Sequence, residues 1–390
     1  MSQDTSRDSY SVRVFNHDLA SALQKFHDTV WPARRGSKGT LRSSSIDHDD
    51  TAGKRGASSP IFLFLKNKEV IGHLGTMHVE IQRGDVRFPA HWVVGLMVLP
   101  EFRNGLVGPQ LIKKVSESLS FAMTLHVEDA VSRIVKGLKW THLGTIPQYI
   151  HVLNGRRLAG QLQLERIDFL SSRQGVGMRA VRYVVKHPIT HVLIGLAARI
   201  IGKTWIMIAA VRQSRSQETS ITEEDGFDES YDELWKEVHR EFAALVVRDR
   251  ASLEAKYGRA HGAFRILACR VRKKLRAFCV LKIRQFENDA RMGNARVGTI
   301  IDCLFNPQDV WAMHELLKEV RRVCVEDRVD AIFCTASHPA LQRLLGSQAF
   351  FEIPGSLRFA YYDRDHVLQQ PMSLSLWHIM RGDADAAANF

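Results

Sequence analysis

Residues 93–114, VVGLMVLPEFRNGLVGPQLIKK, combine an apolar run, a turn that holds one arginine and two glycines, and the start of an amphipathic segment. The apolar run reaches Pro100, which cannot donate to a strand ladder, so the pattern predicts a strand that is buried on both faces and ends before this proline. The glycines permit a tight turn, and a helix that begins directly after it directs unpaired N–H groups into the loop. The sequence therefore predicts a phosphate-binding turn here.

The same turn resembles a known family. The phrase V-x-P-E-[FY]-R, followed by small residues and a helix, is similar to motif A of the GNAT acyltransferase superfamily, whose loop [QR]-x-x-G-x-[GA] cradles the pyrophosphate of an acyl-coenzyme A. The pattern carries over to Arg103 and Gly108, and Leu106 stands where the family has its central glycine. The resemblance implies acetyl-CoA or another acyl-CoA as co-substrate, with no metal. It implies that the coenzyme is bound by Leu96, Met97, Val98, Arg103, Asn104, Gly105, Leu106, Val107 and Gly108.

Length, charge and cysteine content narrow the class of protein. A chain of 390 residues predicts two or three domains, and its net charge of +12 favours anionic partners. The basic residues are dispersed, and no zinc-ligand spacing or RNA-binding motif occurs, so nucleic acid is not an expected partner. The five cysteines lack C-x-x-C spacing. Together with a polar N-terminus that is no secretory signal, they indicate a cytoplasmic protein without disulfides.

The order of predicted elements defines a first domain over residues 11–165, after a disordered stretch at 1–10. It is the order of the GNAT fold, an α/β fold (of the α+β kind) in which helices flank a mixed, mostly antiparallel sheet. The predicted strands are 11–14, 61–65, 69–82, 88–98, 122–127 and 149–153, and the predicted helices start at 18, 108 and 130.

A second GNAT-like domain is predicted over residues 227–390, because the same order recurs there. Its strand-to-helix junction at 302–307 has neither glycine nor arginine, so no pyrophosphate cradle is expected in this half. The predicted strands are 266–271, 276–286, 297–304, 331–335 and 358–362, and the predicted helices are 227–249, 307–326 and 338–347.

Motifs across the chain resemble those of tandem GNAT-like proteins encoded near bacterial exopolysaccharide and lipopolysaccharide genes. The resemblance implies that the acceptor is an amine such as an amino sugar of a surface polysaccharide precursor. The motif resemblance extends over roughly residues 10–385. The matching residues are Phe227, Asp228 and Trp235; Val247, Arg248, Asp249, Leu253 and Tyr257; Ile301 and Asp302; and Trp377, Gly382, Asp383 and Asp385.

The segment 166–226 between the domains is basic and apolar and predicts a helical linker. Within it, 189–211 is apolar for about the length that spans a bilayer, but Arg199 and Lys203 interrupt it. Three interpretations stay open: a helix packed against a domain, a basic amphipathic helix on an anionic membrane surface, and a true span. The second would place a cytoplasmic protein peripherally at the inner membrane face.

Acyl transfer to an amine requires a base and a polarised thioester carbonyl. The resemblance implies that the carbonyl accepts from the central strand, and it makes His91 or Glu80 the candidate base. Each has a simpler interpretation, His91 as a strand-end residue and Glu80 as a solvent-facing one. Val135 stands where the family has its acidic tyrosine, so Tyr149 is the nearest alternative acid. Asp302 either holds a substrate amine or caps the following loop.

Three functions follow from these residues. The first is an acyl-CoA-dependent N-acyltransferase acting on an amino sugar or similar amine. The second is a degenerate, non-catalytic GNAT pair that binds a nucleotide-linked or lipid-linked intermediate or a partner enzyme. The third is a transferase of the same kind that uses aminoacylated transfer RNA.

Overall fold

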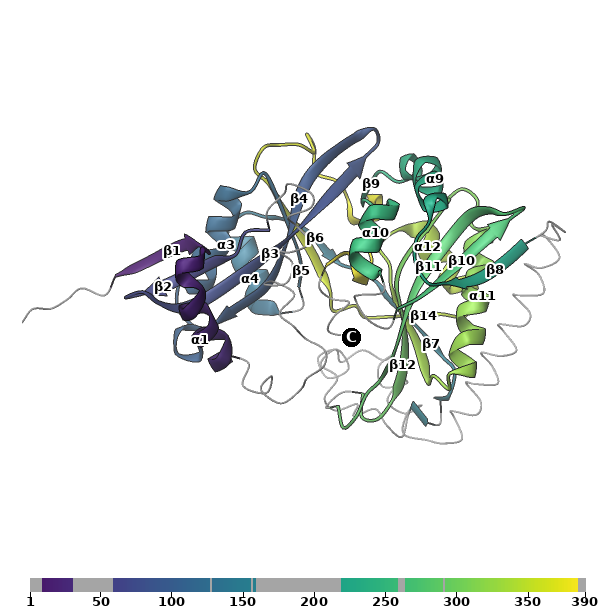
Figure 1. The fold of residues 1–390 in the computed structure, drawn as a ribbon, viewed down its shortest axis with the longest axis horizontal. Helices are drawn as coiled ribbons and strands as arrows, with labels where there is room; N and C mark the ends of the chain where they lie inside the picture. Colours follow the sequence, from purple (N-terminus) through teal and green to yellow (C-terminus); the bar gives the residue numbers. More distant parts are fainter. Residues whose placement is uncertain are drawn as a thin grey trace, which may run out of the picture. The chain divides into compact units, whose positions relative to one another are not determined.

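The computed structural model describes residues 9–30, 59–126, 128–155, 157–158, 219–258, 264–289 and 292–384. They form two compact units (Figure 1). The first unit comprises the chain up to Ile81, Arg87–Gly144 and Leu357–Met372, and the second comprises the remainder. The predicted boundary at residue 165 and the segment 189–211 lie outside the described residues.

The first unit is built on a mixed sheet with the strand order β1-β2-β3-β4-β5-β15-β6. Neighbouring strands are antiparallel between β1, β2 and β3 and between β5 and β15, whereas β4 and β5 are parallel. The strands are β1 (Tyr10–Val14), β2 (Phe62–Lys66), β3 (Glu69–Arg83), β4 (Val86–Val98), β5 (Phe121–His126), β6 (Thr141–Thr145) and β15 (Arg358–Asp363).

Helices cover both faces of this sheet because each presents an apolar stripe. On one face, α3 (Val107–Ser118) and α4 (Asp129–Gly137) share a buried cluster with β2, β3 and β5. On the other, α1 (Ala20–Val30) packs Leu23 and Phe26 against β2 and β3. The short 3-10 helices are η1 (His17–Leu19) and η3 (Pro100–Phe102).

The second unit repeats this architecture with the order β8-β10-β11-β12-β13-β7-β14. The parallel pair is here β12 and β13, and the other neighbours are antiparallel. The strands are β7 (Gln148–Val152), β8 (Thr219–Glu224), β10 (Phe264–Val271), β11 (Lys274–Gln285), β12 (Arg296–Phe305), β13 (Ala331–Thr335) and β14 (Phe351–Ile353). The helices are α9 (Glu229–Val238), α10 (Arg250–Tyr257), α11 (Trp311–Glu326) and α12 (Pro339–Ser347).

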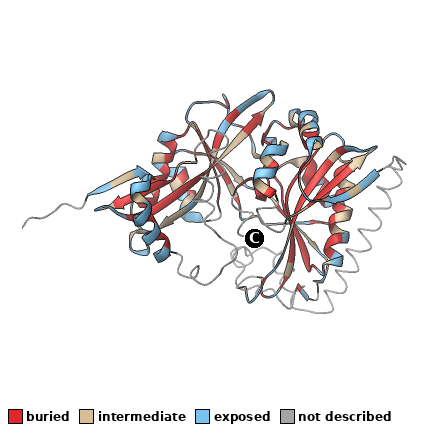
Figure 2. Ribbon diagram, in the orientation of Figure 1, coloured by how far each residue is buried: buried red, intermediate tan, exposed pale blue. Residues whose placement is uncertain are grey.

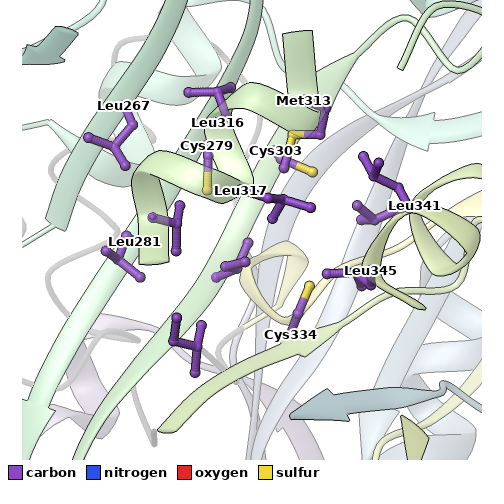
Figure 3. Packing of buried hydrophobic residues seen from close by; sticks show 14 of the residues in the cluster. Leu267, Cys279, Leu281, Cys303, Met313, Leu316, Leu317, Cys334, Leu341 and Leu345 are labelled. Carbon is purple, nitrogen blue, oxygen red and sulfur yellow. The ribbon is translucent and has the colours of Figure 1, made fainter. Parts of the chain in front are cut away.

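The largest core of the second unit lies between its sheet and α11 and α12 (Figure 3). Leucines of both helices meet sulfur-bearing side chains of the strands, and all five cysteines are buried and free. On the other face, α9 and α10 pack aromatic side chains against β11 and β12. In Figure 2 much of the sheet of the second unit is red, the colour of buried residues. Burial raises the pKa of the Cys303 thiol well above its usual value, so this cysteine is a core residue rather than a nucleophile.

Each sheet takes its sixth strand from the other half of the sequence. β7 pairs with β13 and β14, and β15 pairs with β5. The predictions that 149–153 closes the first sheet and that 358–362 closes the second are therefore wrong. The apolar pattern locates a strand correctly, but a period of two carries no information about the partner strand.

Two further expectations need correction. Residues 219–224 were expected in the linker but form edge strand β8, paired with β10. The predicted helix 227–249 ends much earlier, because α9 stops at Val238 and a 3-10 turn, η5 (His239–Glu241), follows. Residues 244–246 form β9 (Ala244–Val246), which pairs in parallel with β16 (Trp377–His378). A short apolar segment with an available partner strand favours a strand over a helix, and the β-branched Val246 adds to this preference.

The predicted fold class is confirmed: mixed sheets flanked by helices, in two compact units. The hairpins β2–β3 and β10–β11 each turn through two residues with positive φ, Asn67 and Lys68 in one and Arg272 and Lys273 in the other. No helix among the described residues is long and apolar enough to cross a membrane.

Candidate functional site

The first unit carries its candidate site where β4 and β5 part. Parallel pairing between the two strands joins His91 to Ala122 and Trp92 to Met123 and does not continue within the described residues. The rest of β4, Val93–Val98, is half-buried except for exposed Gly95, so the predicted burial on both faces is wrong. Without a neighbour from β5, this stretch of backbone is free to meet a ligand.

A buried histidine holds the bend in β4. Gly95 has a φ of 61°, a conformation that glycine adopts without strain. His73 on β3 places Nδ1 2.9 Å from the Gly95 carbonyl oxygen, which can only accept, so Nδ1 carries the proton. Burial lowers the pKa of His73 more than this hydrogen bond raises it, so the ring is neutral. His73 is not among the residues predicted from the sequence, although its position between two glycines in GHLG indicates a crowded strand.

The loop after β4 has the predicted strand–turn–helix geometry. Arg103 donates from Nε to the Val98 carbonyl oxygen at 3.1 Å, which ties the loop back to the end of the strand. The helix α3 then begins at Val107 with no side-chain cap. Pro109 falls in the first turn, where a missing N–H costs no helical hydrogen bond. Leu106, the residue directly before the helix, is 70% exposed.

Close packing fixes this helix against the sheet. A Cβ atom added to Gly72 on β3 would lie 2.4 Å from Cγ1 of Val107, so only glycine allows α3 to approach so closely. A Cβ on Gly108 would lie 3.3 Å from Ile134 of α4. The amide end of α3 is thus held in place by tertiary contacts, which supports a preorganised anion site.

The two predicted bases lie in the first unit. His91 is half-buried on β4, with its ring edge-to-face with His78 at 5.1 Å between centroids. Glu80 on β3 forms an ion pair with Arg87 across the hairpin, and both side chains are partly exposed. His91 therefore lies where β4 and β5 separate, whereas the carboxylate of Glu80 is already paired with Arg87.

The other two candidate residues lie in the second unit. Tyr149 sits on β7, is buried, and donates to Oε2 of Glu352 at 3.1 Å. Burial and this carboxylate raise the pKa of Tyr149 well above its usual value. The proposed replacement for the family's tyrosine is thus not in the unit that holds Arg103.

Asp302 is fully buried in an ion-pair network. Its Oδ1 accepts from Nε of Arg248 at 2.8 Å, and its Oδ2 accepts from the Tyr257 hydroxyl at 2.8 Å. Arg248 also donates to both carboxylate oxygens of Asp383. Burial opposes ionisation, but Arg248 and Lys256 outweigh it and lower the pKa of Asp302. Asp302 therefore balances a buried arginine, and its predicted role in holding a substrate amine stays a prediction.

The chain itself occupies the corresponding place in the second unit. Parallel pairing of β12 and β13 ends at Ile300 and Cys334. Beyond it, His378 Nε2 lies 3.0 Å from the Cys303 carbonyl oxygen, and Met380 bridges to Ala336. Segment 377–383 thus contacts backbone groups of the second unit beyond the point where β12 and β13 separate. The corresponding part of β4 in the first unit has no such segment among the described residues. The asymmetry favours the first unit as the ligand-binding one.

The sequence matches no protein-family model, and no curated protein is significantly similar to it. Solved structures do share its fold. A conserved Enterococcus faecalis V583 protein described as a probable N-acyltransferase matches with a TM-score of 0.53 at 9% identity, over 92% of this chain and 73% of its own. Saccharomyces cerevisiae N-myristoyltransferase with bound myristoyl-CoA matches with a TM-score of 0.52 at 12% identity, over 91% and 83%.

A GCN5-related N-acetyltransferase from Anabaena variabilis gives a TM-score of 0.54 at 10% identity, over 90% of this chain and 72% of its own. At these identities the likeness concerns the fold. The fold is thus that of GNAT-type N-acyltransferases, as the strand order and the parting of β4 and β5 indicate. No group of three or more His, Cys, Asp or Glu side chains among the described residues is placed to hold a metal ion.

Proposed function

We propose that the protein is an acyl-CoA-dependent N-acyltransferase, most simply an acetyltransferase, whose first unit binds the coenzyme. The observation that carries the proposal is the uncapped first turn of α3 beside Arg103. It follows the end of β4, which is no longer paired with β5 there. Amide N–H groups, a helix dipole and a guanidinium together suit a diphosphate. The similar fold of a protein that binds myristoyl-CoA supports the choice of coenzyme.

Acyl transfer from a thioester to an amine requires few catalytic groups of this chain. The open backbone of Leu96–Val98 would donate to the thioester carbonyl oxygen, as the resemblance implies. The acceptor nitrogen bonds to that carbonyl carbon, the C–S bond breaks, and a base removes the proton from the nitrogen. We assign the base to His91 in preference to Glu80, whose carboxylate is paired with Arg87. Because buried Val135 replaces the family's tyrosine, water would protonate the departing sulfur.

For the acceptor we propose an amine such as an amino sugar of a surface polysaccharide precursor. The motif resemblance supports this class, and the net charge of +12 favours an anionic precursor. The same charge is compatible with a protein that works at an anionic membrane surface. A non-catalytic binding protein is the second candidate, and the observation in its favour is that Leu106 and Val135 replace two functional residues of the family.

Calorimetry with acetyl-CoA tests the proposal directly. The full chain should bind the coenzyme, and Arg103→Ala should weaken binding by about 10- to 100-fold, since a charge-assisted hydrogen bond contributes roughly 1.5–3 kcal/mol. Arg13→Ala is the matched control, because Arg13 is an exposed arginine of the same unit on edge strand β1. No heat at millimolar acetyl-CoA would remove the basis for the proposal.

A further inference from the structure

The second unit contains a basic cavity that acyl transfer in the first unit does not use. Its volume is about 400 Å³, and its lining includes Arg272, Lys274 and Arg276 from the β10–β11 hairpin and β11. Small-molecule sites typically measure about 300–1,000 Å³, so this cavity can hold more than an isolated anion.

Strand pairing explains why the cations gather there. Ala277 pairs with Phe305, so Arg276 on β11 lies beside Asn306, at the point where β12 ends. The first turn of α11 follows, contributes Trp311 to the lining, and begins without a side-chain cap. The junction 302–307 itself supplies no arginine. The positive charge comes instead from the neighbouring strand and hairpin.

The charge balance of the cavity is positive. Asp309 is the one carboxylate among the lining residues and faces three cations. Outside the lining, Glu237 pairs with both Lys274 and Arg276 and offsets part of their charge. Arg272, which is exposed, forms no ion pair with any described residue. One guanidinium therefore remains available for a ligand.

The wall of the cavity is mixed in character. Besides the cations, the lining includes the apolar residues Val271 and Ala312 and the half-buried Trp311. Arginine and lysine favour phosphate oxygens, and an aromatic ring favours a flat or apolar group. We infer that this cavity binds a phosphorylated small molecule, with the phosphate on Arg272, Lys274 and Arg276 and its organic part against Trp311.

Calorimetry on the full chain with inorganic pyrophosphate and with uridine 5′-diphosphate tests the inference. The uridine nucleotide is chosen because it lacks the adenosine of coenzyme A and so discriminates against the first unit. One uridine nucleotide should bind per chain, uridine alone should not bind, and affinity should fall as salt rises, because the contact is electrostatic. Pyrophosphate should bind at this cavity in addition to the turn of the first unit that is proposed to hold the coenzyme diphosphate.

The hairpin supplies a matched pair of variants. Arg272 and Lys273 have φ values of 49° and 68°, and asparagine tolerates this conformation. Arg272→Asn should weaken binding about tenfold or more, whereas Lys273→Asn, with the same change of charge outside the lining, should stay within about twofold. Thermal unfolding of both variants checks that the fold is kept.

Arg103→Ala separates the two sites. It should leave nucleotide binding unchanged and remove only the pyrophosphate bound in the first unit, even if it removes coenzyme binding, and Arg272→Asn should leave coenzyme binding unchanged. The inference is overturned if neither probe binds at millimolar concentration. It is also overturned if Arg272→Asn and Lys273→Asn behave alike, or if Arg103→Ala abolishes the binding of both probes.

Discussion

At the scale of single residues, features that depend on neighbours in the sequence could be predicted, whereas contacts between distant residues could not. Pro100 ends β4, and the loop to α3 begins at Arg103, as the residue types require. His73 could not be found this way, because the carbonyl it binds lies 22 residues further along the chain. The burial that makes its ring neutral is equally a product of packing.

His73→Phe should reduce the free energy of unfolding by about 1–3 kcal/mol, because the Gly95 carbonyl loses its donor in a part-buried place. It should also lower acyl transfer through kcat, since the bend aligns the open backbone of β4. Urea unfolding and steady-state kinetics measure the two effects. His73→Gln keeps an N–H donor and should recover part of both. A phenylalanine variant with unchanged stability and kcat would contradict the role given to His73.

Asp302 provides a second residue-scale test. Asp302→Asn removes a charge that balances buried Arg248, so it should destabilise the second unit by about 3–5 kcal/mol. Asp365→Asn, a change at an exposed carboxylate that pairs with its neighbour Arg364, should cost almost nothing in the same urea titration. A raised KM for the acceptor at unchanged stability would instead restore Asp302 as a substrate-binding residue.

At the scale of elements, the existence of strands was easier to predict than their partners. The apolar alternation located β7 and β15 within a residue or two, but each belongs to the sheet of the other unit. A strand's own sequence specifies which faces are buried, and many sheet positions satisfy that requirement. The partner is selected by the complete set of tertiary contacts.

Ala360→Pro tests the exchanged strand. Ala360 is buried in β15 and paired with Thr124 of β5, and proline there removes a ladder hydrogen bond and leaves its partner unsatisfied, at a cost of about 1–3 kcal/mol. We expect faster hydrogen exchange in β5, although the mutation lies more than two hundred residues away in sequence. Ser373→Pro is the control, since Ser373 is exposed with a φ of −69°. Unchanged exchange in β5 would contradict the observed pairing.

At the scale of the whole molecule, buried histidines make stability depend on pH. Burial, together with the charge of Arg248, lowers the pKa of His378 to about 3, and burial lowers the pKa of His126 to about 4. Below pH 6.5 the unfolded chain binds protons that the folded chain does not. The free energy of unfolding should therefore fall as pH drops from 6.5 to 5, by up to about 1.4 kcal/mol per pH unit for each such histidine.

Urea titrations between pH 7.5 and 5 measure this slope. His378→Gln cannot titrate but can still donate to the Cys303 carbonyl oxygen, which His378 Nε2 approaches at 3.0 Å. The variant should lose about one histidine's share of the slope. A slope equal to that of the unmodified chain would show that His378 does not stay neutral in the folded state.

The sequence by itself determined the fold class, the course of β4 into α3 and the position of Arg103, because strand periodicity, proline and glycine act over a few residues. The tertiary structure alone decided which strand completes each sheet, which carboxylates balance Arg248, and which histidine holds the bend in β4. It also gathered the cations of the second unit's cavity from a hairpin outside the predicted junction. These outcomes depend on contacts between segments far apart in the chain, for which no single segment carries a signal.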